Sequence, residues 1–228
     1  MTYDTKINMD EFVMGVKLLR WHLVSKAGGE VLEVASGTGR NLGYYNYGGG
    51  GGGVSGPMGW LAGLLGWRSK ESVVTKLVLT DKSEEMVKTA KDKVSTMGLR
   101  ANIQIDVGDG SDLSRFADNS FDTVVDTFGL CSFDDPVKVL LEMQRVCKKD
   151  GGKILLIEHG RSNYWEWLDN VLDEGKDQHV EKWGCEWNRD IDKIVSDSGL
   201  LVDSRSKWHF GTTSVIHGRP KQRADEAR

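Results

Sequence analysis

The sequence lacks several features that would assign it to a class at once. Its three cysteines, Cys131, Cys147 and Cys185, are odd in number and widely spaced, so they predict neither a disulfide scaffold nor a metal site with CxxC spacing. No run approaches the 18 apolar residues of a membrane-spanning helix. Lysine and arginine number 30 against 34 acidic residues, and this lack of a basic excess argues against a nucleic-acid partner.

What is present is the composition of a globular protein, with 39% hydrophobic and 28% charged residues in 228. This length predicts one enlarged domain over residues 1–220, followed by a polar tail at 221–228. Glycine is overused, and a run of glycines opens a segment, 48–72, that we interpret as an insertion. Its apolar stretch at 58–67 is too short to cross a bilayer, which leaves a surface loop, a lip over a site, or a peripheral membrane or protein contact.

The hydrophobic pattern predicts alternating strands and helices. Apolar residues at three- and four-residue spacing indicate an amphipathic helix at 9–26. Five strands are expected at 30–35, 76–80, 102–107, 121–127 and 153–158. Helices are expected at 83–96, 136–148, 163–176 and 188–198. Two final strands, 200–206 and 210–217, form a predicted hairpin, so the fold class is α/β with a doubly wound, mostly parallel, seven-stranded sheet and an antiparallel edge.

The turn after the first strand is the clearest functional signal. Residues 36–41 are small or polar and are predicted to open a helix whose free amides bind a nucleotide-like ligand. Leu42 stands where the dinucleotide motif requires a third glycine, and no Gly-Lys-Ser/Thr loop exists, so NAD, FAD and P-loop chemistry are disfavoured. What remains is Glu33-x-Ala35-x-Gly37-x-Gly39, which resembles the first motif of class I S-adenosylmethionine-dependent methyltransferases, with Ala35 in place of the usual glycine.

Two further acids follow the second and third strands. Asp81 can accept the hydroxyl groups of a ribose, and Asp109 can approach an adenine amine. Asp81 lies 42 positions after Gly39, about twice the usual ~20. The insertion accounts for the excess and is therefore expected close to the cofactor. Each aspartate alone is as well explained by a helix cap or a turn, but together they favour a binding site.

Several segments now resemble the UbiE-like methyltransferases of ubiquinone and menaquinone biosynthesis. They are VLEVASGTGRN at 31–41, DKSEEM at 81–86, GDGSDL at 108–113, DNSFD at 118–122, TFGL at 127–130 and DGGK at 150–153. Segments 128–132, 157–161, 182–190 and 209–213 more selectively resemble the fungal mitochondrial Oms-type methyltransferase-like proteins and, more distantly, the animal thiol methyltransferases. The resemblance implies a Rossmann-like class I fold and a mitochondrial location; without it, a cytoplasmic one is expected from the cysteines.

The resemblance also implies S-adenosylmethionine as cofactor and a set of residues around it. Glu33, Ala35, Gly37 and Gly39 are expected on its methionine side, Asp81 at the ribose, Met86 at the adenine, and Thr127 with Phe128 beside the sulfonium. The complete predicted cofactor set is Glu33, Ala35, Ser36, Gly37, Thr38, Gly39, Asn41, Asp81, Lys82, Met86, Gly108, Asp109, Gly110, Thr127 and Phe128.

The predicted reaction is methyl transfer to a small aromatic or lipophilic acceptor, either a quinone precursor or a thiol. A base is needed only if the acceptor loses a proton, and His159 is the first candidate, with His209 the second. Cys131 is expected to be a buried hydrophobe and residues 182–190 to be packing, so no metal is expected. The alternative is a non-catalytic assembly factor or complex subunit that still binds the cofactor and docks through the insertion.

Overall fold

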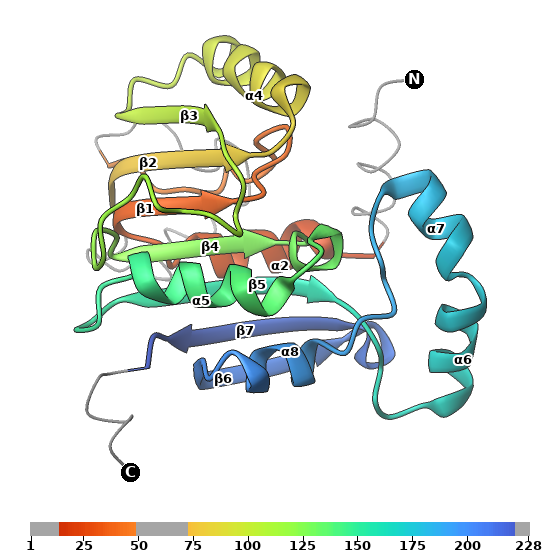
Figure 1. Cartoon of the computed structure of the whole chain (residues 1–228). Helices are drawn as coiled ribbons and strands as arrows, with labels where there is room; N and C mark the ends of the chain where they lie inside the picture. Colours follow the sequence, from red (N-terminus) through yellow and green to blue (C-terminus); the bar gives the residue numbers. More distant parts are fainter. Residues whose placement is uncertain (1–13, 49–72, 222–228) are drawn as a thin grey trace.

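The computed structural model describes residues 14–48 and 73–221, which form a seven-stranded sheet with helices on both faces (Figure 1). The strands are β1 (Gly29–Val34), β2 (Val74–Asp81), β3 (Ile103–Val107), β4 (Thr123–Thr127), β5 (Lys153–His159), β6 (Leu201–Trp208) and β7 (Thr213–Arg219). The α-helices are α2 (Val16–Val24), α4 (Glu84–Met97), α5 (Pro136–Val146), α6 (Glu166–Glu174), α7 (Lys176–Trp183) and α8 (Ile191–Asp197). Short 3₁₀ turns are η2 (Leu130–Ser132) and η3 (His209–Gly211).

The sheet has the order β3-β2-β1-β4-β5-β7-β6, and β7 runs antiparallel to both of its neighbours. The predicted fold class is therefore confirmed, but the terminal strands differ from a simple edge hairpin. The antiparallel strand β7 lies inside the sheet, and β6 forms the edge. Burial explains why β7 is the inner strand and β6 the edge strand, because β7 is almost wholly buried whereas β6 is largely exposed.

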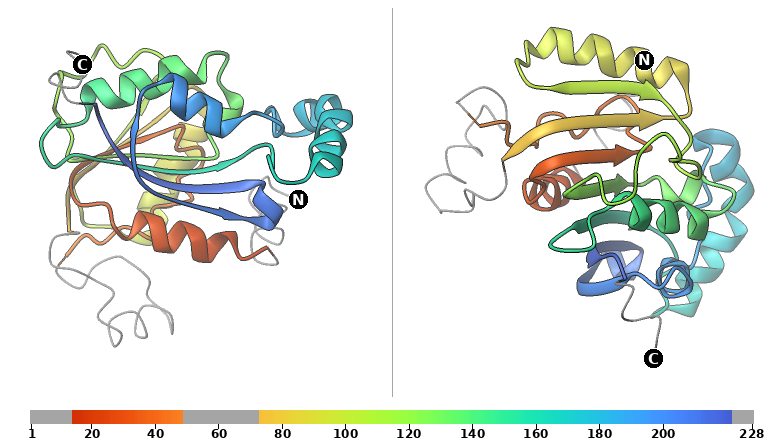
Figure 2. Two further views of the ribbon diagram at one scale, coloured as in Figure 1. Left: turned by 90° about the horizontal axis from the view of Figure 1, so that it is seen from below. Right: turned by 60° about the vertical axis from the view of Figure 1, so that its left-hand side comes forward.

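Apolar residues fill both faces of the sheet. On one face, Leu140 and Met143 of α5 and Val195 of α8 join the strand residues in one cluster. On the other face, Leu23 of α2 and Val87 of α4 join a second cluster. Figure 2 shows α2 on one side of the sheet and α5 with α8 on the other. None of the helices in the described ranges is long and apolar enough to cross a membrane.

Local signals explain where the helices begin and end. The Ser83 hydroxyl accepts a hydrogen bond from the Met86 N–H at the start of α4, and Gly98 ends that helix in the left-handed conformation. The helix predicted at 163–176 is confirmed by α6, but α7, which follows after a break at Gly175, was not predicted. A Cβ on Gly175 would lie 3.0 Å from the ring of Trp187, so the backbone at Gly175 packs closely against the segment that carries Trp187.

The helix predicted to open after β1 is also absent from the described chain. Residues 37–44 form consecutive turns instead, in which the Gly39 N–H bonds to Ser36 O at 3.0 Å and the Tyr44 N–H to Asn41 O at 2.8 Å. Gly37 and Gly39 have φ values of 55° and 70°, which a right-handed helix does not allow. The turn therefore has no helix dipole at the cofactor side.

The predicted insertion at 48–72 lies, apart from Gly48, outside the described residues. Its attachment points are described, since the Val74 N–H bonds to Asn46 O at 2.7 Å where β2 begins. The chain thus leaves and rejoins the domain at the amino ends of the parallel strands. These attachment points lie at the end of the sheet opposite to the carboxyl ends, where a doubly wound sheet binds ligands. The expectation that the insertion lies close to the cofactor concerns residues outside the described ranges and stays a prediction.

Candidate functional site

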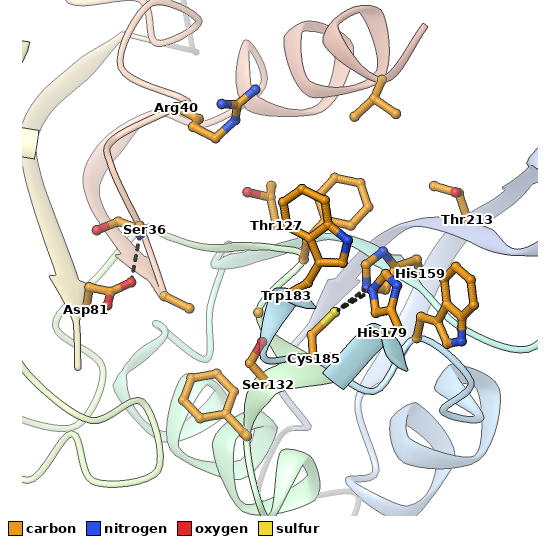
Figure 3. Close-up of a pocket in the computed structure, with 18 of the residues that line it drawn as sticks. Ser36, Arg40, Asp81, Thr127, Ser132, His159, His179, Trp183, Cys185 and Thr213 are labelled. Carbon is orange, nitrogen blue, oxygen red and sulfur yellow. Dashed lines mark hydrogen bonds between the residues drawn. The ribbon is translucent and has the colours of Figure 1, made fainter. Parts of the chain in front are cut away.

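A cavity of about 1700 Å³ lies at the carboxyl ends of the parallel strands. The ends of β1 to β5 form its floor, and α6 and α7 stand beyond these ends (Figure 1). Figure 3 shows Ser36 and Asp81 at one end of the cavity, His159, His179 and Cys185 at the other, and Thr127 and Trp183 between them. The cavity therefore joins the predicted cofactor segments to a second region next to α7.

The turn after β1 and the end of β2 are joined by the carboxylate of Asp81. Its Oδ2 accepts a hydrogen bond from the Gly37 N–H at 2.8 Å, and its Oδ1 accepts one from the Ser83 N–H at 2.9 Å. Asp81 therefore shapes the turn before α4, which is one of the two roles weighed from the sequence, and it also lines the cavity, where its role at a ribose stays a prediction. Each carboxylate oxygen retains a second lone pair for a ligand hydroxyl.

Asp109 is held in a similar way at the end of β3. Its Oδ1 accepts hydrogen bonds from the N–H and the hydroxyl of Ser111, at 2.9 and 2.8 Å, and its Oδ2 lies 3.3 Å from Lys82 Nζ. The Ser111 N–H is the main cause that holds the pKa of Asp109 below its usual value. The carboxylate of Asp109 is thus an anion on the cavity wall, and these contacts fix its orientation.

The structure brings most of the predicted cofactor residues to one wall. Those that line the cavity are Ala35, Ser36, Gly37, Thr38, Asp81, Lys82, Met86, Gly108, Asp109, Thr127 and Phe128. Glu33, Gly39, Asn41 and Gly110 do not reach it. Gly39 and Gly110 are instead packing positions, because a Cβ there would lie 2.6 Å from Leu42 Cδ1 and 2.5 Å from Val34 Cγ1.

Glu33 lies behind the wall in a buried polar network. It accepts hydrogen bonds from Asn41 Nδ2 at 3.0 Å and from the Tyr45 hydroxyl at 2.6 Å. Complete burial raises its pKa to about 7, although both hydrogen bonds and the nearby Arg20 oppose the rise. Glu33 therefore supports the loop from inside and does not contact the cavity.

Arg20 of α2 was not predicted from the sequence, yet it connects this network to the cavity. Its Nη1 donates to Thr127 Oγ1 at 2.6 Å and to Asn41 Oδ1 at 3.1 Å, and its guanidinium lies 4.9 Å from the centre of the Phe128 ring. Only its place on the inner side of an amphipathic helix signals this role. The network positions Thr127 and Phe128, the predicted neighbours of the reacting atoms.

The two histidines predicted as bases are both engaged by neighbours. His209 Nδ1 lies 2.9 Å from Thr213 Oγ1 and its Nε2 lies 2.7 Å from Met14 O, so both ring nitrogens have partners. His159 ends β5, and its Nε2 lies 3.2 Å from Cys131 Sγ and 3.3 Å from Cys185 Sγ. The contact between the two cysteines raises the pKa of Cys131 and lowers that of Cys185.

The wall formed by α6 and α7 was missed at the sequence level. Residues 182–190 were expected to be packing, but Trp183, Cys185 and Trp187 all line the cavity, together with Leu168 and Leu172 of α6. The resemblance at 182–190 was the one signal for this region. The second half of the cavity is consequently rich in aromatic and aliphatic side chains.

Backbone strain concentrates at the same site. Within residues 14–48 and 73–221, six residues other than glycine have positive φ, and two of them are asparagines, which tolerate it. The other four are Ala35, Phe128, His209 and Phe210, with φ between 50° and 61°. All four line the cavity, and such strain is typical of ligand-binding positions.

The fold and the position of the cavity are similar to those of class I S-adenosylmethionine-dependent methyltransferase domains. A family model described as "Methyltransferase domain" matches residues 50–155. The predicted class and the predicted cofactor, S-adenosylmethionine, are both confirmed.

Two curated relatives are similar along the chain. "Methyltransferase OMS1, mitochondrial" from Saccharomyces cerevisiae is 32% identical over 223 residues, which are 96% of this chain and 44% of the relative. "Ubiquinone/menaquinone biosynthesis C-methyltransferase UbiE" from Bdellovibrio bacteriovorus is 34% identical over 140 residues, 61% of this chain and 48% of the relative. The chain thus spans about half the length of these relatives.

A solved structure shares the fold. Geranyl diphosphate methyltransferase in complex with S-adenosylmethionine aligns with a TM-score of 0.61, covering 91% of this chain and 84% of its own at 12% identity. At this identity the likeness concerns the fold alone.

Proposed function

We propose that the whole protein transfers the methyl group of S-adenosylmethionine to a small apolar acceptor, of the quinone-precursor or thiol class. The observation that carries the proposal is one continuous cavity with a polar half at Ser36, Asp81 and Asp109 and an apolar half at Trp183 and Phe210. Its volume of about 1700 Å³ exceeds the ~300–1,000 Å³ of sites for a single drug-sized ligand. Two ligands can therefore meet inside it.

The polar half fits the cofactor on independent grounds. The hydroxyl of Ser36 is buried at the cavity wall and finds no hydrogen-bond partner among the described residues. A Cβ on Gly37 would meet no atom within 4 Å, so the missing side chain leaves space at the cavity surface. We assign Ser36 and the glycine turn to the amino-acid end, Asp81 to the ribose and Asp109 to the adenine.

The cofactor supplies a methyl group already activated by positively charged sulfur. The residues of this chain therefore have to align donor and acceptor and exclude water, which can supply roughly 7–11 kcal/mol. Thr127 and Phe128 are held at the meeting point of the two halves by Arg20. We assign neither predicted histidine as a base, because His209 has partners on both nitrogens and His159 Nε2 contacts two thiols.

Thermal unfolding with and without S-adenosylmethionine tests the cofactor assignment. At about 100 times the dissociation constant, binding stabilises a folded domain by roughly 2.7 kcal/mol, a rise in Tm of several degrees. Asp81→Ala removes this rise, whereas Asp203→Ala, which alters an exposed aspartate paired with Arg219, retains it. An unchanged rise in Asp81→Ala would contradict the assignment.

The acceptor class is tested by turnover. We expect release of the demethylated cofactor with a hydroquinone or an alkyl thiol and none with a short RNA. Binding of the cofactor without turnover on any acceptor would instead support the non-catalytic alternative. We also propose a mitochondrial location, because a similar relative is named as mitochondrial. The proposed membrane or protein contact at 48–72 concerns residues that, except for Gly48, lie outside the described ranges.

A further inference from the structure

Two cysteines and a histidine that are far apart in the sequence meet beside the apolar half of the cavity. Cys131 follows β4 in η2, His159 ends β5, and Cys185 follows α7. Their ligand atoms, two sulfurs and one imidazole nitrogen, all lie within 4.8 Å of one another. Cys131 is 1% exposed and Cys185 is 7% exposed, so this cluster is a built interior feature and not a chance surface grouping.

The spacing of these atoms is that of ligands around one small ion. With Zn–S bonds of about 2.3 Å and Zn–N bonds of about 2.0–2.1 Å, tetrahedral angles place a ligating sulfur and nitrogen about 3.5 Å apart. His159 Nε2 lies 3.2 Å from Cys131 Sγ and 3.3 Å from Cys185 Sγ. Both distances are therefore within a few tenths of an ångström of the separation that a shared zinc ion requires. The set of two sulfurs and one nitrogen contains no oxygen ligand, which favours a soft divalent ion over magnesium or calcium.

The backbone and a second imidazole support the cluster. The Glu186 N–H donates to the carbonyl oxygen of Cys131 at 2.9 Å, which fixes the segment carrying Cys185 against the segment carrying Cys131. His179 Nε2 lies 3.2 Å from Cys185 Sγ, and its ring stacks on Trp187 with centroids 4.1 Å apart. Such outer contacts hold the sulfur of a metal site in place.

We propose that Cys131, His159 and Cys185 bind one zinc ion, with His179 as a positioning residue that donates to the Cys185 sulfur. His159 and Cys185 line the cavity, so the fourth coordination position faces the acceptor half (Figure 3). Three protein ligands with an open position are the arrangement of catalytic rather than structural zinc sites. This inference stands on the ligand geometry and does not depend on the proposed methyl transfer.

Metal analysis of the purified chain tests the site. The chain is prepared with a phosphine reductant and no chelator, incubated with micromolar zinc and desalted before elemental analysis. We expect about one zinc per chain in the wild type and less than a tenth of that in Cys185→Ser and in His159→Gln. Cys147→Ser is the matched control and is expected to retain the ion, because Cys147 is equally buried but its sulfur bonds to Lys153 O at the amino end of β5, whereas His159 lies at the carboxyl end.

Circular dichroism of each variant shows whether it is folded, and cobalt in place of zinc provides an independent signal. Replacement of zinc by Co²⁺ gives a thiolate charge-transfer absorption in the wild type that Cys185→Ser loses and Cys147→Ser retains. A folded wild type that binds no zinc overturns the proposal. So does equal zinc content in all the variants, or a disulfide between Cys131 and Cys185 that persists in reductant.

Discussion

At the scale of single residues, burial decides what each predicted group does. Glu33 belongs to the sequence motif, yet its carboxyl group is completely buried and bonds to Asn41 and Tyr45. Two more carboxyl groups, Asp126 and Glu158, are completely buried beside the loop that follows β4. Burial is the main cause that raises the pKa of Asp126 to about 8 and that of Glu158 well above its usual value. The second cause is repulsion by Glu33 at Asp126 and repulsion by Asp126 at Glu158.

The raised pKa of Glu33 makes a prediction about stability and pH. Because the folded pKa, about 7, exceeds the ordinary value of 4.5, the group adds stability below pH 4.5 that is lost as the pH rises through 7. Glu33→Gln removes this titration while keeping the shape of the side chain. Between pH 5 and pH 8, the free energy of unfolding of the wild type should fall by about 2–3 kcal/mol more than that of Glu33→Gln.

Urea unfolding at the two pH values measures this difference. Glu30→Gln is the matched control, because Glu30 lies on the same strand but is half exposed and pairs with Lys76. Its pH dependence should follow that of the wild type. Parallel curves for Glu33→Gln and the wild type would show that Glu33 does not titrate differently in the folded state.

At the scale of secondary-structure elements, a polar contact fixes the position of α2. Leu19, Leu23 and Val24 pack against the sheet, as the amphipathic pattern predicts. Arg20 lies between these residues and is only 5% exposed, with its guanidinium bonded to Asn41 and Thr127. The helix therefore holds the turn after β1 and the end of β4 in one arrangement.

Arg20→Met tests this connection, since it keeps most of the apolar length but removes the guanidinium. Loss of hydrogen bonds to a charged group costs about 1.5–3 kcal/mol, so the free energy of unfolding should fall by that amount. Leu18→Ala on the same helix changes a half-exposed side chain and should cost less than about 1 kcal/mol. Chemical denaturation compares the two, and an equal loss in both variants would argue against a special role for Arg20.

At the scale of the whole molecule, the two ends of the sheet carry different structural features. The carboxyl ends of the strands carry the cavity, the strained residues and the cysteine and histidine cluster. The attachment points of the segment between Gly48 and Val73 lie at the amino end of β2, where the Val74 N–H bonds to Asn46 O. Changes at this attachment are therefore distant from the residues that we assign to the cofactor.

Replacement of residues 49–72 by a short glycine–serine linker tests this separation. We expect the variant to fold and to keep the rise in Tm caused by S-adenosylmethionine within about 1 °C of the wild-type rise, since Asp81 and the glycine turn are untouched. Thermal unfolding measures it. A folded variant that has lost the rise would show that the deleted segment contributes to the cofactor site.

The sequence by itself determined the alternation of strands and helices, the glycine turn and the aspartates after β2 and β3. These features are local, because periodic burial and strand-end chemistry leave a pattern within a few residues. The class and the cofactor followed from the resemblance of these motifs to those of known methyltransferases. The break at Gly175 and the turns at 37–44 were not predicted, because a close approach of Trp187 and the inward bonds of Asn41 override the local helical pattern.

Only the tertiary structure decided which residues meet. Cys131, His159 and Cys185 lie on three different segments with no ligand spacing in the sequence, and the order of the strands brings their side chains within 4.8 Å. Glu33 and Asp81 look alike as motif acids, but one points into the core and the other into the cavity. Side-chain direction and long-range pairing depend on the packing of the whole sheet, and a local pattern contains no information about that packing.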